Sequence, residues 1–147
     1  MYDCILVATD GSELSRKAVD TATGLAASLA AELFILHVVP RYPTAYFEGG
    51  VPMEAEELMR VERQWAEQGR ALVNEEAARA EKAGVTARAT VMQSDHVAES
   101  ILAAAHKHRC GLIVMASHGR HGLQRVLLGS ETQHVLTRGD LPVLVLR

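Results

Sequence analysis

Three glycines and a serine between positions 119 and 130 form the part of the sequence best suited to bind an anion. Gly119, Gly122 and Gly129 follow an apolar run at residues 112–115 and precede Ser130. Glycine lets the backbone approach a phosphate closely and adopt positive φ angles. The N–H groups that open a helix lack intrahelical partners and carry the positive end of the helix dipole, so a glycine loop before a helix favours negative charge. An ordinary loop-to-helix junction without a ligand is the competing interpretation.

Ser130 is expected to cap the helix that follows this loop. Together with Gln133, three positions later, it matches a capping box that would begin a helix running through Leu136. Glu131 adds a carboxylate beside the proposed anion site, where it could repel phosphate, assist through a metal ion, or turn away as a favourable acid of the first helical turn. We favour the last of these alternatives.

Ionisable side chains in the same loop could supply positive charge. His118, Arg120 and His121 flank or follow Gly119, and a cation there could meet phosphate oxygens. Exposed loop side chains without a specific partner are the more common case. The chemistry of the loop therefore depends on the elements that hold it in place.

Apolar runs and helical periodicities alternate along the chain. Strands are predicted at 4–8, 33–39, 85–92, 112–115 and 143–146, and helices at 13–31, 53–83, 95–108 and 130–136. Gly11 and Ser12 supply a turn and an N-cap after the first strand, and Gly84 ends the second helix. This alternation predicts an α/β fold with one domain over residues 1–147, a five-stranded parallel sheet and helices on both faces in a three-layer sandwich.

The second helix is expected to bury an apolar stripe and to expose a charged face. The predicted stripe contains Leu58, Val61, Trp65, Leu72 and Val73. Before this helix, residues 40–52 hold three of the four prolines together with Tyr42, Tyr46 and Phe47. A loop of this length either serves as a functional flap or partner contact, or is pinned to the body by its aromatic rings.

Composition excludes several classes of function. A formal net charge of -3, without a long run of Lys or Arg, argues against nucleic-acid binding. No segment has the form of a signal peptide or a membrane span. Cys4 and Cys110 lie far apart in the sequence, so no disulfide framework is indicated, and a reducing cytoplasm is expected.

Catalytic and metal motifs are also missing. The sequence contains none of GxxxxGK[ST], GxSxG, HExxH and CxxC, which indicates neither a P-loop NTPase nor a standard hydrolase. His106, His108 and Cys110 are possible ligand types, but position 108 would leave the helical face that 106 and 110 share, and no fourth ligand has a clear spacing. We therefore expect neither catalytic residues nor a metal site.

The spacing in the glycine loop resembles the universal stress protein family. Its nucleotide-binding members carry a glycine, two residues, a second glycine, nine residues, and then Gly with Ser or Thr. Gly119, Gly129 and Ser130 match this pattern with its nine-residue spacing, whereas Ala116 stands in place of the first glycine. A second difference lies at the start of the third helix, where Ser94 and His96 replace a glycine and a proline that relatives often have.

The resemblance implies a Rossmann-like sheet of order 3-2-1-4-5, with ATP held between the first and fourth strands; the nucleotide is expected either with or without Mg²⁺. Asp10 would then face Gly119 and accept hydrogen bonds from ribose hydroxyls, although bonding within its own turn carries equal weight. The apolar members of the expected site could line a purine or form ordinary core. The full set of expected site residues is Ala8, Thr9, Asp10, Val38, Met115, Ala116, His118, Gly119, Arg120, Gly122, Gly129, Ser130, Glu131 and Thr132.

The last predicted strand indicates a homodimer. Val143–Leu146 is an apolar strand that would be prone to aggregation if it were left bare at a sheet edge. Pairing with a second copy would cover it, and the resemblance implies the same arrangement. The expected function is a cytoplasmic, ATP-binding, dimeric stress-response sensor or adaptor with an unknown protein partner. A dimeric interaction module without nucleotide is the main alternative, and a slow ATPase is a weaker one.

Overall fold

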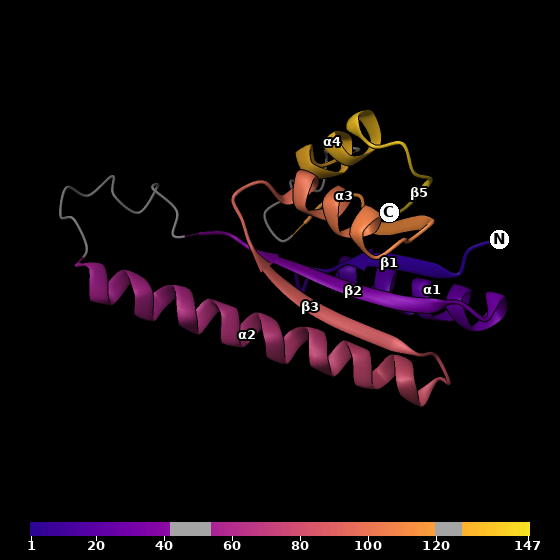
Figure 1. Cartoon of the computed structure of the whole chain (residues 1–147), viewed down its shortest axis with the longest axis horizontal. Helices are drawn as coiled ribbons and strands as arrows, with labels where there is room; N and C mark the ends of the chain where they lie inside the picture. The colour runs from indigo at the N-terminus through magenta and orange to yellow at the C-terminus, as the bar shows by residue number, and fades with distance from the viewer. Residues whose placement is uncertain (42–53, 120–127) are drawn as a thin grey trace.

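Five parallel strands form one sheet with the order β3-β2-β1-β4-β5. The computed structural model describes residues 1–41, 54–119 and 128–147, and Figure 1 shows its elements. The strands are β1 (Cys4–Ala8), β2 (Glu32–Val39), β3 (Ala87–Gln93), β4 (Leu112–Ala116) and β5 (Val143–Leu146). The helices are α1 (Glu13–Leu29), α2 (Ala55–Lys82), α3 (Val97–Lys107) and α4 (Ser130–Arg138). The predicted α/β fold and strand order are confirmed.

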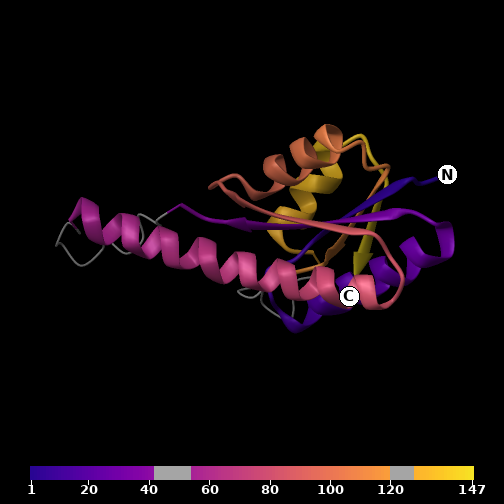
Figure 2. The same ribbon diagram turned by 60° about the horizontal axis from the view of Figure 1, so that its bottom comes forward.

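The two faces of the sheet are covered by different helices. Ile5 and Val7 of β1 point toward a core shared with α1 and α2, whereas Cys4 and Leu6 point toward a core shared with α3 and α4. This alternation follows from the two-residue period of a strand. Figures 1 and 2 show these two pairs of helices as separate layers on either side of the sheet. The central strands are buried on both sides, which explains their unbroken apolar sequences.

Three helices end in residues with left-handed backbone angles. These residues are Ala30 (φ 54°), Gly84 (φ 84°) and Arg109 (φ 56°). After Arg109 the N–H of Cys110 donates to the carbonyl of Ala105 at 2.8 Å, which is the closing bond of a Schellman motif. Gly84 was expected to end α2, while the alanine and the arginine occupy a conformation in which glycine is less strained. These tight endings return the chain directly to the sheet.

The stripe predicted to be buried on α2 is only partly correct. Val73 is buried, but the other four members of the predicted stripe are only partly buried: Leu58, Val61, Trp65 and Leu72. For Leu58, Val61 and Trp65, Figures 1 and 2 show the reason, since the first half of α2, in which they lie, extends past the end of the sheet. The buried positions lie farther along the helix, where Glu76 is 1% exposed and pairs with Arg16 of α1 and Arg79 of α2.

The predicted element bounds are otherwise close to those observed. β5 lies at one edge of the sheet and β3 at the other. Most of the predicted loop at 40–52 falls outside the described residues. Within the described part of the chain, no helix has the length and apolar character needed to cross a lipid bilayer.

Candidate functional site

A pocket of about 400 Å³ opens where β1 and β4 end and α4 begins. This position is the reversal point of the strand order, because β2 and β4 lie on opposite sides of β1, and ligands of open parallel sheets bind at such points. Its size suits a small molecule. It is lined by Ala8, Thr9, Asp10, Ser15, Leu36, Val38, Val97, Ile101, Met115, Ala116, His118, Gly119, Gly129, Ser130, Glu131 and Thr132.

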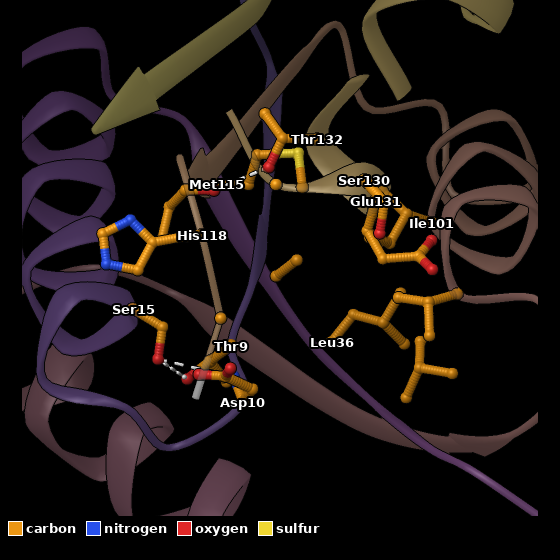
Figure 3. A pocket seen from close by; sticks show the side chains of 16 residues that line it. Thr9, Asp10, Ser15, Leu36, Ile101, Met115, His118, Ser130, Glu131 and Thr132 are labelled. Carbon is orange, nitrogen blue, oxygen red and sulfur yellow. Dashed lines mark hydrogen bonds between the residues drawn. The ribbon is translucent and has the colours of Figure 1, made fainter. Parts of the chain in front are cut away.

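The structure brings together all of the predicted site residues that it describes. Figure 3 shows Thr9, Asp10 and Ser15 on one side of the pocket, with Ser130, Glu131 and Ile101 on the other. Arg120 and Gly122 lie outside the described residues, as does His121. The predicted contributors therefore come from the carboxyl ends of β1, β2 and β4 and from the start of α4, which the topology brings together.

The wall formed by β1 and α1 is held by a local hydrogen-bond network. The Thr9 and Ser15 hydroxyl oxygens lie 3.1 Å apart, and the N–H of Ser12 donates to Asp10 Oδ1 at 2.9 Å. Gly11 makes the turn with φ 82°, and the Ser12 hydroxyl accepts from the N–H of Ser15 as the predicted N-cap. Asp10 thus accepts a hydrogen bond within its own turn, and this bond fixes its carboxylate at the pocket wall.

The opposite wall corrects the predicted capping of α4. Gly129, rather than Ser130, is the N-cap, with extended angles and no side-chain hydrogen bond to the helix. The N–H of Gln133 donates to the carbonyl of Gly129 at 3.0 Å, so the capping box expected between Ser130 and Gln133 is wrong. The N–H of Gly129 is itself engaged, donating to the carbonyl of Ser117 at 2.5 Å. That bond links Gly129 to Ser117, which follows β4. The helix therefore begins at Ser130, one residue earlier than it would if Ser130 were its N-cap.

Tight packing explains the glycines at 119 and 129. A Cβ atom on Gly119 would lie 2.6 Å from Asp10 Oδ2, and one on Gly129 would lie 3.2 Å from the carbonyl oxygen of Ser117. Asp10 and Gly119 therefore face each other across the crevice, as expected. Thr132 reinforces the second junction, because its hydroxyl donates to the carbonyls of Ala116 and Ser117 at 2.9 and 3.3 Å.

Glu131 contacts the first turns of two helices, α4 and α3, which lie far apart in the sequence. It is an acid in the first turn of α4, as expected, but its carboxylate also accepts the N–H of Ala98 at 3.0 Å. Ala98 lies in the first turn of α3, whose N-cap residue His96 makes no side-chain capping bond. One carboxylate thus stabilises the positive ends of two helices while lining the pocket.

The apolar wall of the pocket includes residues that sequence reasoning missed. Leu36 of β2 with Val97 and Ile101 of α3 lie beside the expected Val38 and Met115. Strand and helix patterns do not distinguish such pocket residues from ordinary core residues. Ser15 was missed as well, because its orientation toward Thr9 depends on the rotation of α1.

Potential metal-ligating side chains are not clustered in the part of the pocket that the structure describes. Among residues 1–41, 54–119 and 128–147, no three His, Cys, Asp or Glu side chains gather as ligands for an ion. The arrangement instead combines an apolar wall, a fixed carboxylate at Asp10 and the open N-terminus of α4. Those features suit an organic anion with an apolar part.

Comparison with known proteins gives matches along the whole chain. A family model for the universal stress protein family matches residues 1–147. Universal stress protein YxiE of Bacillus subtilis is 33% identical over 149 residues that cover 100% of each chain. Universal stress protein MJ0531 of Methanocaldococcus jannaschii is 32% identical over 152 residues, covering 100% of this chain and 83% of that protein.

Solved structures share the fold. The structure of MJ0577 matches with a TM-score of 0.84 at 26% identity, covering 99% of this chain and 96% of that one. Two further universal stress protein structures are complexes with cAMP and with dAMP. Their TM-scores are 0.72 and 0.67 at 24% and 16% identity, and each covers 99% of this chain and 97% or 98% of its own.

Proposed function

Because this chain belongs to the universal stress protein family, we propose that it binds ATP in the pocket between β1, β4 and α4. In this proposal the protein is a dimeric sensor or adaptor rather than an enzyme. The bound nucleotide sets its shape or its affinity for a protein partner. Solved members of the same fold that hold cAMP or dAMP support a nucleotide as the class of ligand.

The start of α4 is the observation that carries the proposal. The first N–H groups of any helix lack intrahelical acceptors, and α4 has no side-chain cap to occupy them. Ser130, Glu131 and Thr132 open this helix and line the pocket. Charge-assisted hydrogen bonds from such groups to phosphate oxygens contribute roughly 1.5–3 kcal/mol each. Several of them together would hold a triphosphate.

The rest of the pocket suits the adenosine part of the ligand. Leu36, Val38 and Met115 offer an apolar surface for a purine, and Asp10 presents a carboxylate that could accept hydrogen bonds from ribose hydroxyls. Mg²⁺ would enter on the phosphates and keep most of its water ligands, which agrees with the missing ligand cluster among the described residues. The residues present therefore fit ATP, with or without the ion.

Isothermal titration of the full chain with ATP, ADP, AMP and adenosine tests this assignment. Affinity is expected to fall as phosphates are removed, since the α4 contacts are lost first. Equal affinity for ATP and adenosine would place the phosphates elsewhere. No binding of any of these ligands at millimolar concentration would overturn ATP binding and favour an interaction module without nucleotide, an alternative that the carboxylate of Glu131 in the pocket wall supports.

A pair of alanine-to-leucine variants locates the ligand. Ala8 lines the pocket at the end of β1, so Ala8→Leu should fill it and abolish ATP binding. Ala103 is exposed on α3. Ala103→Leu adds the same atoms outside the pocket, so this variant should bind ATP as the wild-type chain does.

A separate measurement tests the slow ATPase. Release of ADP during long incubation of the wild-type chain with ATP would support that alternative.

The free edge of β5 supports dimerisation in the same proposal. The carbonyl of Pro142 accepts a hydrogen bond from Ile113 of β4, and that of Leu146 accepts one from Ser117, which follows β4. The alternate residues Val143 and Val145 therefore turn their backbone groups outward. Leu144 is 36% exposed. A second copy could pair along this edge about a two-fold axis and satisfy the outward groups.

A backbone substitution in β5 tests this interface while keeping the hydrogen bonds between β4 and β5. Val145→Pro removes an outward N–H, which an edge strand tolerates, and should convert the dimer to a monomer in light scattering after size exclusion. Val145→Thr keeps the N–H and should remain dimeric. A wild-type chain that is monomeric at all concentrations would contradict this part of the proposal.

A further inference from the structure

The two cysteines meet at the amino ends of β1 and β4, at the end of the sheet opposite the pocket. Cys4 opens β1, and Cys110 lies in the short connection between α3 and β4. Although 106 positions separate them in sequence, their Sγ atoms are 2.8 Å apart. Both side chains are buried, at 6% and 3% exposure, and both thiols are free. The sequence alone did not predict this contact, because the two cysteines lie far apart along the chain.

Backbone hydrogen bonds on both sides hold the sulfur atoms together. The N–H of Gly111 donates to the carbonyl of Cys4 at 2.9 Å, and the N–H of Cys110 donates to the carbonyl of Ala105 at 2.8 Å. The left-handed Arg109 fixes the turn that delivers Cys110. β1 and β4 are adjacent strands, with Ile5 paired to Leu112 directly beyond the two cysteines. Neither sulfur can move far while the sheet is intact.

The surroundings make the two thiols chemically unequal. A hydrogen bond from the Cys110 thiol lowers the pKa of Cys4 to about 7, assisted by the positive charge of Arg88 and opposed by burial and by Glu32. The same hydrogen bond, together with burial, raises the pKa of Cys110. The Cys4 thiol is therefore the more readily ionised of the two, and thiolates rather than thiols are nucleophiles.

We propose that Cys4 and Cys110 form an oxidation site that takes hydrogen peroxide as its co-substrate and closes to an intramolecular disulfide. The Cys4 thiolate attacks one peroxide oxygen, the O–O bond breaks, and the departing hydroxide takes a proton to become water. This leaves a sulfenic acid on Cys4. The Cys110 sulfur then loses its proton and attacks the Cys4 sulfur. The S–O bond breaks, and the oxygen leaves as a second water molecule. Two thiols and one peroxide give one disulfide and two waters.

The geometry favours closure over further oxidation. A disulfide bond is about 2.05 Å long, so the sulfurs need to approach by only about 0.8 Å from their separation of 2.8 Å. The resolving thiol is already in contact with the sulfur that is oxidised first. A sulfenic acid at Cys4 should therefore condense with Cys110 before a second peroxide reaches it.

Intact mass spectrometry of the full chain under denaturing conditions is the primary test. After reduction and brief treatment with hydrogen peroxide, the chain should lose about 2 Da, the mass of two hydrogen atoms. Both cysteines should become unreactive toward a thiol reagent, and dithiothreitol should reverse both changes. The product should remain a single chain on non-reducing gels. An unchanged mass, addition of oxygen without loss of hydrogen, or linkage between chains would overturn the proposal.

Matched variants separate the roles of the two sulfurs. Cys110→Ser keeps the proposed nucleophile without its resolving partner, so peroxide should leave a sulfenic acid on Cys4 that dimedone traps. Cys4→Ser keeps only Cys110 and should give little or no adduct over the same time. Equal labelling of the two variants would refute the assignment of Cys4. If either variant fails to fold, the mass change of the wild-type chain still decides the proposal.

Oxidation should leave the candidate ligand pocket unchanged. The cysteines lie at the amino ends of β1 and β4, whereas the pocket lies at the carboxyl ends of the same strands. ATP affinity, measured by titration, is expected to agree within about twofold between the reduced and oxidised chains, whereas the urea midpoint of unfolding should rise after oxidation because the crosslink restricts the unfolded state. This inference stands even if the chain binds no nucleotide.

Discussion

Replacing Ser130 with aspartate should separate ligand binding from helix stability. Ser130 is the first residue of α4, lines the pocket, and is not the cap of the helix. An acid in the first turn of a helix is favourable by about 0.3–1 kcal/mol, so Ser130→Asp should unfold at an equal or higher urea concentration. For ATP the effect has the opposite sign, because the new carboxylate would stand where phosphate is expected.

The size of the loss follows from Coulomb's law. Two unit negative charges about 4 Å apart, at an effective dielectric constant of about 20, repel by about 4 kcal/mol, which corresponds to a roughly 1000-fold weaker complex. Isothermal titration measures the affinity, and urea denaturation followed by circular dichroism measures the stability.

Two control variants isolate the charge and the position. Ser130→Asn has nearly the same shape as Ser130→Asp but carries no charge, so it should weaken ATP binding only severalfold. Ala55→Asp places the same charge at the first residue of α2, and should leave ATP affinity unchanged. Wild-type affinity in the Ser130→Asp variant would show that the phosphates do not lie at the start of α4.

Three further predictions concern the local energetics. Ala30 has a φ of 54°, so Ala30→Gly should raise the free energy of unfolding by about 0.5–1 kcal/mol. The control Ala27→Gly, at an exposed position of α1, should lower it by about as much. Burial lowers the pKa of His108 below its ordinary value. The unfolded chain therefore takes up this proton first, and thermal melts at about pH 7 and about pH 5 should show a smaller loss of stability for His108→Gln than for wild type. Glu131→Gln weakens the bond to Ala98 and should cost about 1 kcal/mol in urea unfolding, while titration should show tighter ATP binding because a negative charge leaves the pocket.

Much of the fold can be predicted from the sequence because it rests on local patterns. Unbroken apolar runs such as residues 112–115 indicate strands buried on both faces, and helical periodicity marks the segments between them. Gly11, Ser12 and Gly84 mark the ends of elements for reasons contained within a few residues of backbone. The approach of Asp10 to Gly119 also follows, once a parallel sheet of the expected strand order brings the ends of β1 and β4 together.

Contacts between distant segments required the tertiary structure. The bond from Gly129 to Ser117 displaces the cap predicted at Ser130, and the reach of Glu131 to Ala98 depends on how α4 packs beside α3. Because the first half of α2 extends beyond the sheet, most of the stripe predicted to be buried on this helix is only partly buried. A periodic pattern shows which face of a helix is apolar, but not how much of its length finds a partner.

The cysteine pair shows most clearly what the sequence determines and what the tertiary structure adds. Composition established that the chain has only two cysteines, and local apolar pattern placed Cys4 at the start of a strand. Their contact at 2.8 Å depends on the crossover that sets β4 beside β1 and on the turn at Arg109 that ends α3. Local sequence thus determines which elements form, because their hydrogen bonds and burial repeat within a few residues. Tertiary structure decides which side chains meet, because that depends on how elements far apart in the chain pack together.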